Sequence, residues 1–204
     1  MDFPGIEEIN KGVKEFRKNE GRAAMYKVAS FLIDHFWGKP AEMADGLSVL
    51  LSTWNQAFYR YGTFDLNKLE KCIRDNLPKI KKYRSRNISS LSASDEKDIK
   101  KLFNEFLMAL KQINKRKKRG HKSPVSVAKA IHLLAPKFFP LWDDKIARAY
   151  GCHYSNNPAE QYIKFCEIMK GFSERLKDKV SYKDWPFLKI VDEYNYSKHT
   201  KHWI

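Results

Sequence analysis

The residues best suited to chemistry lie in one stretch of the chain, between Lys115 and Gly151. Lys122 stands just before one predicted helix start, and Asp143 stands just before another. A positive helix end and a neighbouring basic run both disfavour an ammonium group, so they favour the neutral amine of Lys122. A neutral lysine amine can form a Schiff base, and a nearby carboxylate can deprotonate the nucleophile or stabilise a cationic sugar. The alternative is that Lys122 is one more solvated lysine and Asp143 only caps a helix.

Other chemical signatures are missing from the sequence. It has no Walker loop and no G-x-G-x-x-G, G-x-S-x-G or H-E-x-x-H motif. Its six histidines are scattered without metal-ligand spacing, and its three cysteines form no C-x-x-C pair. His132, on an apolar helix, is predicted to be a core residue, and so is His35. We therefore expect neither a metal site nor a cofactor.

The charge of the chain points to a polyanionic partner. Its 204 residues include 39 Lys and Arg against 24 Asp and Glu, which gives a formal net charge of +15. Nucleic acid is the favoured partner, because neutralising phosphates releases counterions. A membrane partner is disfavoured, since no apolar run has membrane-spanning length and the charge is not confined to one amphipathic face. An odd number of distant cysteines indicates a reducing compartment, the cytoplasm of a prokaryote (with nucleoid association) or the nucleus of a eukaryote.

Three clusters are candidates for ligand contact. The basic run from Lys111 to Lys122 is either a phosphate-binding loop or a solvated linker, and its central residues are Lys115, Arg116, Lys117, Lys118 and Arg119. The basic stretch from Lys79 to Arg86 is a solvated loop by default, and its candidate phosphate contacts are Lys82 and Arg84. A third cluster either packs in the core or faces a ligand, and it contains Trp54, Asn55, Gln56, Phe58, Tyr59 and Tyr61.

Helices are the elements that must position these residues. Apolar residues recur at helical spacing in residues 23–37, 47–54, 65–77 and 99–110, and no stretch alternates as a strand would. Ser123 is a predicted N-cap with Pro124 at the first helical position, and Asp143 or Asp144 caps a helix that Gly151 ends. A further helix from 158 is predicted to break near 171. The chain is predicted to be all-α, with roughly eight to ten helices.

Three segments resemble the helix-hairpin-helix base-excision DNA glycosylases of the endonuclease III superfamily. PLWDDKIARAYG resembles the family's VDTHVxRxxxRLG segment, which places Asp143 on the catalytic aspartate and Arg148 on the helix arginine. KSPVSVAKAIHLLA resembles the family's KT-initiated helix and is nearest to the archaeal 8-oxoguanine glycosylase branch. There the Schiff-base lysine begins the helix, which implies Lys122, with Lys129 on the same helix as the fallback. The LPGVGxKT hairpin itself is absent, and Gly120-His121-Lys122-Ser123 stands in its place.

The third segment, LSVLLSTWNQ, resembles the family's LIxxxLSxQxT helix and would put Trp54 and Asn55 beside a flipped base. Trp54, Trp142 or a tyrosine of the Tyr59/Tyr61 pair would stack on that base. The resemblance implies a two-lobed helical bundle, with a central lobe of roughly 45–120 and a second lobe formed by the N-terminal helices and 121–204. It also implies a monomeric enzyme that acts on double-stranded DNA carrying a damaged or modified base, cleaves the N-glycosidic bond and cuts the strand through a lysine-dependent lyase step.

Two other functions remain open from the sequence. The chain is alternatively a non-catalytic nucleic-acid-binding protein that keeps the same helical scaffold. It is otherwise a helical interaction or regulatory protein, such as an RNA- or ribosome-associated factor, whose positive charge has another purpose. Turnover of lesion-bearing DNA separates the enzyme from the binding protein, and affinity for nucleic acid separates both from the third class.

Overall fold

The computed structural model describes residues 4–113, 120–176 and 185–204. Within these residues the chain is helical and forms no strand; Thr63 and Ile113 make an isolated β-bridge. The prediction of an all-α protein is therefore confirmed. The α-helices are α1 (Ile6–Asn19), α2 (Ala23–His35), α3 (Pro40–Trp54), α4 (Gln56–Tyr59), α5 (Leu66–Arg84), α6 (Glu96–Ala109), α7 (Pro124–Leu134), α8 (Asp144–Ala149), α9 (Pro158–Leu176) and α10 (Phe187–Asn195). Short turns η1 (Ile88–Ser90), η2 (Ala93–Asp95) and the π-helical η3 (Tyr196–Thr200) complete the described elements.

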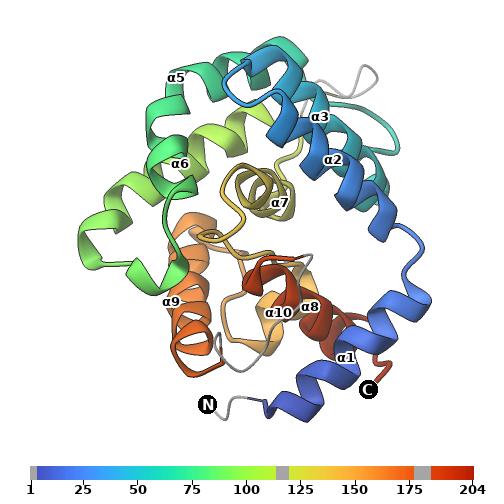
Figure 1. Ribbon diagram of the computed structural model, residues 1–204. Helices are drawn as coiled ribbons and strands as arrows, with labels where there is room; N and C mark the ends of the chain where they lie inside the picture. The colour runs from blue at the N-terminus through green and yellow to red at the C-terminus, as the bar shows by residue number, and fades with distance from the viewer. Residues whose placement is uncertain (1–3, 114–119, 177–184) are drawn as a thin grey trace.

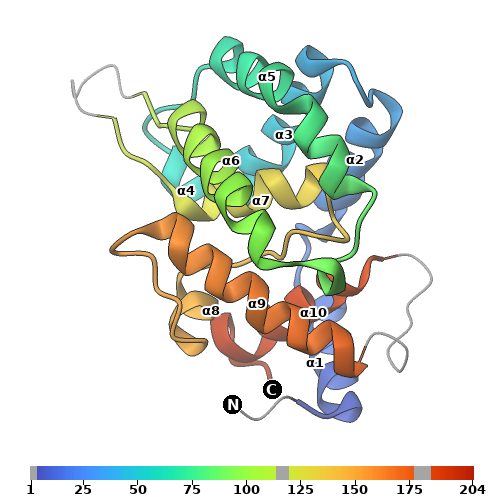
Figure 2. The same ribbon diagram turned by 90° about the vertical axis from the view of Figure 1, so that its left-hand side faces the viewer.

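Helix α7 lies in the middle of the molecule. Figure 1 shows it end-on, with α2, α3, α5 and α6 on one side and α1, α8, α9 and α10 on the other. It packs against α2, α3, α5, α6 and α9, while α1 packs along α10 (Figure 2). The helices α1 and α10 approach closely at Gly12, where a Cβ atom would stand 3.0 Å from the Tyr194 Cα. How these helices divide into the expected central and second lobes stays a prediction.

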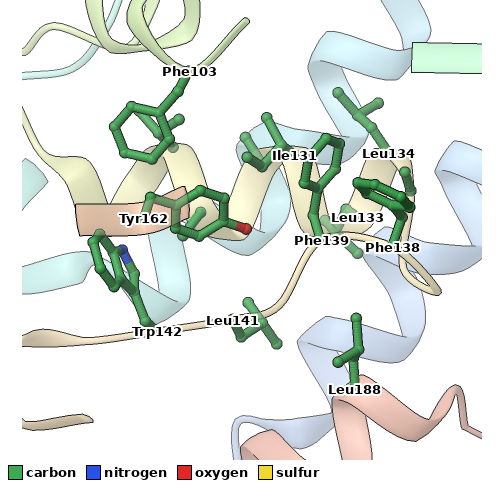
Figure 3. Close-up of a cluster of buried hydrophobic side chains, with 14 of the residues drawn as sticks. Phe103, Ile131, Leu133, Leu134, Phe138, Phe139, Leu141, Trp142, Tyr162 and Leu188 are labelled. Atoms are coloured by element: carbon green, nitrogen blue, oxygen red, sulfur yellow. The ribbon is translucent and has the colours of Figure 1, made fainter. Parts of the chain in front are cut away.

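The core surrounds α7 on all sides. Every residue of α7 from Ser126 to Leu134 is buried, as expected for a helix that is apolar around its whole circumference. Aromatic side chains from α6, α9 and the segment after α7 lie around it (Figure 3). Phe103 and Tyr162 pack with ring centroids 5.0 Å apart, and Trp142 meets Tyr162 edge-on at 5.1 Å. This packing fixes α7, and with it every side chain that α7 presents to its neighbours.

His132 belongs to this core, as the sequence predicts. Its Nε2 accepts a hydrogen bond from the Tyr26 hydroxyl at 2.8 Å, and its Nδ1 donates to the Phe139 carbonyl at 2.7 Å. Burial lowers the pKa of His132 to about 3, so the ring is neutral. The same prediction for His35 is wrong, because His35 is exposed at the end of α2 and stacks on the exposed Phe31.

Two helix boundaries differ from the prediction. The stretch expected to be a basic loop after residue 77 is helical, because α5 continues to Arg84 and buries Ile80 and Tyr83 between its charged residues. Helix α9 runs without a break through Gly171. Both errors arise from local signals, a run of charge and a lone glycine, that the packing of a helix against its neighbours overrides.

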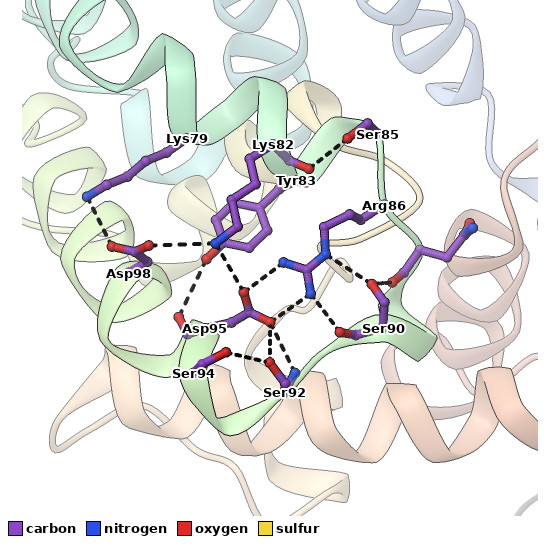
Figure 4. A network of polar contacts seen from close by, with 11 residues as sticks. Lys79, Lys82, Tyr83, Ser85, Arg86, Ser90, Ser92, Ser94, Asp95 and Asp98 are labelled. Carbon is purple, nitrogen blue, oxygen red and sulfur yellow. Dashed lines mark hydrogen bonds and ion pairs between the residues drawn. The ribbon is translucent and has the colours of Figure 1, made fainter.

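A polar network ties the end of α5 to the start of α6 (Figure 4). The Arg86 guanidinium donates to both carboxylate oxygens of Asp95, each at 2.7 Å. The backbone N–H and hydroxyl of Ser92 donate to the same carboxylate at 3.1 and 3.0 Å. The Arg86 guanidinium beside Asp95 holds the pKa of that carboxyl well below its usual range. The network fixes the turns η1, against which α9 packs, and η2, which packs against α6.

Candidate active site

A cavity of about 500 Å³ lies where the C-terminal end of α3 meets the N-terminal ends of α7 and α8. The C-terminal part of α1, the helix α10 and the turn η3 also contribute to its lining. The residues with chemical interest that line it are Trp54, Asn55, Lys129, Trp142, Asp143 and Asp192. The cavity therefore brings together side chains from both ends of the chain.

Lys129 supplies the amine of this cavity. It projects from the buried helix α7 and is 9% exposed. Its Nζ donates to the Trp54 carbonyl at 2.7 Å and to Asn55 Oδ1 at 2.5 Å. Burial lowers the pKa of Lys129 to about 8, although the negative charges of Asp143 and Asp192 act in the opposite direction. A substantial fraction of the amine is consequently neutral near pH 8.

The hydrogen bonds of Lys129 suit the neutral amine. An NH₂ group has two N–H donors, and Lys129 has two acceptors, the Trp54 carbonyl and Asn55 Oδ1. Both acceptors can thus be satisfied while the nitrogen lone pair remains free for attack on an electrophile. The Trp54 carbonyl lies at the C-terminal end of α3, where the helix dipole favours a cation. The surroundings of Lys129 therefore stabilise both its neutral amine and its ammonium form.

Asp143 supplies the carboxylate. It is the N-cap of α8, as predicted, and its Oδ1 accepts a hydrogen bond from the Ile146 backbone N–H at 2.8 Å. Its Oδ2 accepts one from the Thr200 hydroxyl at 2.6 Å. The carboxylate is thus fixed from two sides, by its own helix and by η3. It lines the same cavity as Lys129 and interacts with it electrostatically.

The structure places Lys122 elsewhere. It stands one residue before Ser123, which is the N-cap of α7 as predicted, but it is exposed and does not line the cavity. Lys129 lies seven residues further along the chain, about two helical turns away. The fallback lysine, and not Lys122, is therefore the one that the fold brings to Asp143. The sequence signal for it is a lone lysine within the otherwise apolar helix PVSVAKAIHLL.

The predicted aromatic and amide residues divide into two groups. Trp54 and Trp142 line the cavity, and Trp54 is stacked on Tyr26 with ring centroids 5.7 Å apart. Asn55 lines it too, but its amide nitrogen points inward and donates to Ser126 Oγ at 2.5 Å. Tyr59 does not line the cavity; its hydroxyl lies 3.1 Å from Ser126 Oγ. Tyr59 therefore contacts Ser126, the hydrogen-bond partner of Asn55, and not the cavity itself.

The residues predicted to contact phosphate either lie outside the described residues or pair with acidic side chains. Lys115, Arg116, Lys117, Lys118 and Arg119 lie outside the described residues. Lys82 pairs with Asp95 at 3.4 Å and with Asp98 at 3.8 Å. Arg84 pairs with Asp34, and its guanidinium lies over the Trp37 ring at 4.0 Å. Arg148 pairs with Asp144 at 2.8 Å. The charges of Lys82, Arg84 and Arg148 therefore have acidic partners within the protein.

Several residues around the cavity carried no functional signal in the sequence. Arg60, just after α4, is one of them; it is exposed and lines the cavity. The exposed Gln56 lines it too and belongs to the cluster that was predicted to pack in the core or face a ligand. Asp192, on α10, lines it from the opposite side and pairs with the buried Lys189 at 3.0 Å. Burial raises the pKa of the Asp192 carboxyl. Asp192 lies outside the sequence motifs from which a function was predicted.

Comparisons with protein-family models, with curated proteins and with solved structures find no match. Across the described ranges, no group of three or more His, Cys, Asp or Glu side chains is placed to hold a metal ion. None of the helices in that part of the chain combines the length and apolar character that crossing a membrane requires. The function must consequently be argued from the cavity itself.

Proposed function

We propose that this protein is a DNA glycosylase that flips a damaged or modified base out of the duplex and cleaves its N-glycosidic bond, with Lys129 as the nucleophile. One observation carries the proposal: an amine with its pKa lowered to about 8 lines a cavity together with a fixed carboxylate and two tryptophans. The net charge of +15 supports a nucleic-acid substrate. The resemblance of the α7 and α8 segments to the helix-hairpin-helix glycosylases supports the reaction class.

The chemistry follows from the positions of the groups. The flipped base enters the cavity beside Trp54, whose half-buried ring offers a stacking surface, while the buried Trp142 forms part of the cavity wall. The Lys129 nitrogen forms a bond to the sugar C1′, and the base leaves with the electrons of the glycosidic bond and takes up a proton. Asp143 stabilises positive charge at the sugar and accepts a proton from the attacking amine. Ring opening then gives a Schiff base, and β-elimination cleaves the C3′–O bond of the strand.

Borohydride trapping tests this proposal. Duplex oligonucleotides carrying oxoguanine, uracil, thymine glycol, an alkylated base or an abasic site are incubated with the protein and borohydride, which reduces the Schiff base to a stable adduct. We expect an adduct with at least one lesion, its loss in Lys129→Met, and its retention in Lys122→Ala. Asp143→Asn keeps a helix cap but removes the charge, so base release should slow by about 10²-fold or more. Trapping that survives in Lys129→Met and disappears in Lys122→Ala would return the role to Lys122.

One observation favours a second function, that of a non-catalytic nucleic-acid-binding protein on the same scaffold. Both the Lys129 amine and the Asp143 carboxylate already have internal hydrogen-bond partners, as purely structural groups do. Under this alternative Lys129 only stabilises the C-terminal end of α3. Salt-dependent binding to plain duplex DNA, with no adduct on any lesion, would favour it.

A further inference from the structure

The Asn55 side chain joins the Lys129 amine to the N-terminal end of α7. Its Oδ1 accepts from Lys129 Nζ at 2.5 Å, and its Nδ2 donates to Ser126 Oγ at 2.5 Å and lies 3.3 Å from Ser123 Oγ. This orientation of the amide places a donor against an acceptor at both ends. Ser123 is itself held, since its Oγ accepts from the Ser126 backbone N–H at 3.1 Å. The Asn55 amide is therefore held in place by the two serines, independently of its bond to Lys129.

We propose that Asn55 is a positioning residue, which directs the Lys129 amine into the cavity through an acceptor that carries no charge. The inference rests on the proposed function for the use of the amine as a nucleophile, but the contact between Asn55 and Lys129 can be tested without DNA. It also changes the role given to Asn55 by the sequence resemblance, which placed it against the flipped base.

The absence of charge on this acceptor matters because of the other groups that face Lys129. Asp143 and Asp192 both favour its ammonium form, as does Glu20, whereas burial and Arg22 favour the neutral amine. Burial has the larger effect on the pKa of Lys129, but all three of these carboxylates line the same cavity. A carboxylate in hydrogen-bond contact shifts the pKa of a partner by about 1 to 3 units towards the charged form. An aspartate at position 55 would therefore convert the nucleophile into an ion-pair partner.

The neighbouring Gln56 offers a matched control. It lines the same cavity, but it is exposed and, within the described residues, makes no hydrogen bond to Lys129, whereas Asn55 is 8% exposed. The substitutions Asn55→Asp and Gln56→Glu each replace an amide by a carboxylate of the same size. Solvent screens a charge at position 56 far more than one at position 55. The two variants thus separate direct contact with the amine from the general field of the cavity.

The Lys129 titration is followed by NMR of the lysine Nζ and Cε nuclei, assigned with Lys129→Met. We expect the midpoint to rise by at least about one pH unit in Asn55→Asp, which lowers the neutral fraction at pH 7 about tenfold. It should move much less in Gln56→Glu. In Asn55→Leu, which removes an acceptor of the charged form, it should fall. Equal shifts in Asn55→Asp and Gln56→Glu, or an unchanged midpoint in Asn55→Leu, would overturn the proposal. If Asn55→Asp does not fold, Asn55→Leu decides by the same titration.

Trapping on an abasic-site duplex supplies the second readout. We expect Asn55→Asp to trap about tenfold more slowly at pH 7 and to recover at alkaline pH, because deprotonation restores its nucleophile. Asn55→Leu should remain slow at every pH, because its amine is no longer directed. Wild-type rates in Asn55→Leu would contradict the positioning role. If the wild-type protein forms no adduct on any substrate, the proposed function fails, while the NMR titration still decides the contact between Asn55 and Lys129.

Discussion

At the scale of single residues, Lys129 would make the proposed chemistry sensitive to pH. Its pKa of about 8 means that the ammonium dominates below pH 8 and the reactive amine above it. We predict that the single-turnover trapping rate rises about tenfold per pH unit between pH 6 and 7 and levels off above about pH 8. Rates measured from pH 6 to 10 check this. A rate that keeps rising to about pH 10 would indicate a solvated lysine instead.

The same residues show what a sequence can reveal about a site. Asp143 and Ser123 were predicted as helix caps because a cap depends on residues three or four positions away. The burial of Lys129 depends on Trp54 and Asn55, which lie 75 and 74 positions away, and on Asp192 in another helix. Periodicity cannot show such contacts. It could show a lysine in an apolar helix, but not which neighbours it would meet.

At the scale of elements, the link between α5 and α6 depends on one buried carboxylate. Asp95→Asn removes the paired charge of Arg86 and weakens the bond to Ser92, so we predict a loss of about 3 kcal/mol in the free energy of unfolding. Asp98→Asn is the control, because Asp98 is 40% exposed and pairs with lysines at 3.4 and 3.8 Å. It should cost less than about 1 kcal/mol. Urea denaturation followed by circular dichroism measures both, and equal losses would contradict the prediction.

Element boundaries were predictable where a cap or a stop is local. Asp65 caps α5 by accepting from the Lys68 N–H at 3.3 Å, and Gly151, at a φ of 66°, follows α8 as expected of a residue in the left-handed region. The end of α5 was not predictable from its charges, because the burial of Ile80 and Tyr83 sustains the helix. Tertiary packing thus determines helix boundaries, such as the end of α5, that helix propensity does not predict.

At the scale of the whole molecule, the charge of +15 should govern affinity for DNA. We predict that the dissociation constant for plain duplex rises at least about tenfold between about 50 and 200 mM salt, with a linear log–log dependence. Arg60→Glu, at the cavity, should weaken binding several-fold, whereas Lys71→Glu on α5 should change it by less than about twofold. Fluorescence anisotropy measures both. Equal effects of the two charge reversals would show that the DNA does not approach by the cavity.

The turn η3 ties the candidate site to the completion of folding. Thr200 reaches Asp143 across 57 positions of sequence, and Ser197 bonds to the Gly12 carbonyl at 2.7 Å across 185. A nascent chain that has formed α7 and α8 but has not yet docked η3 holds its amine without a fully anchored carboxylate. Under the proposed function, the pair of Lys129 and Asp143 is therefore complete only after α1 and η3 have come together. An incompletely folded molecule is then expected to have no activity on DNA.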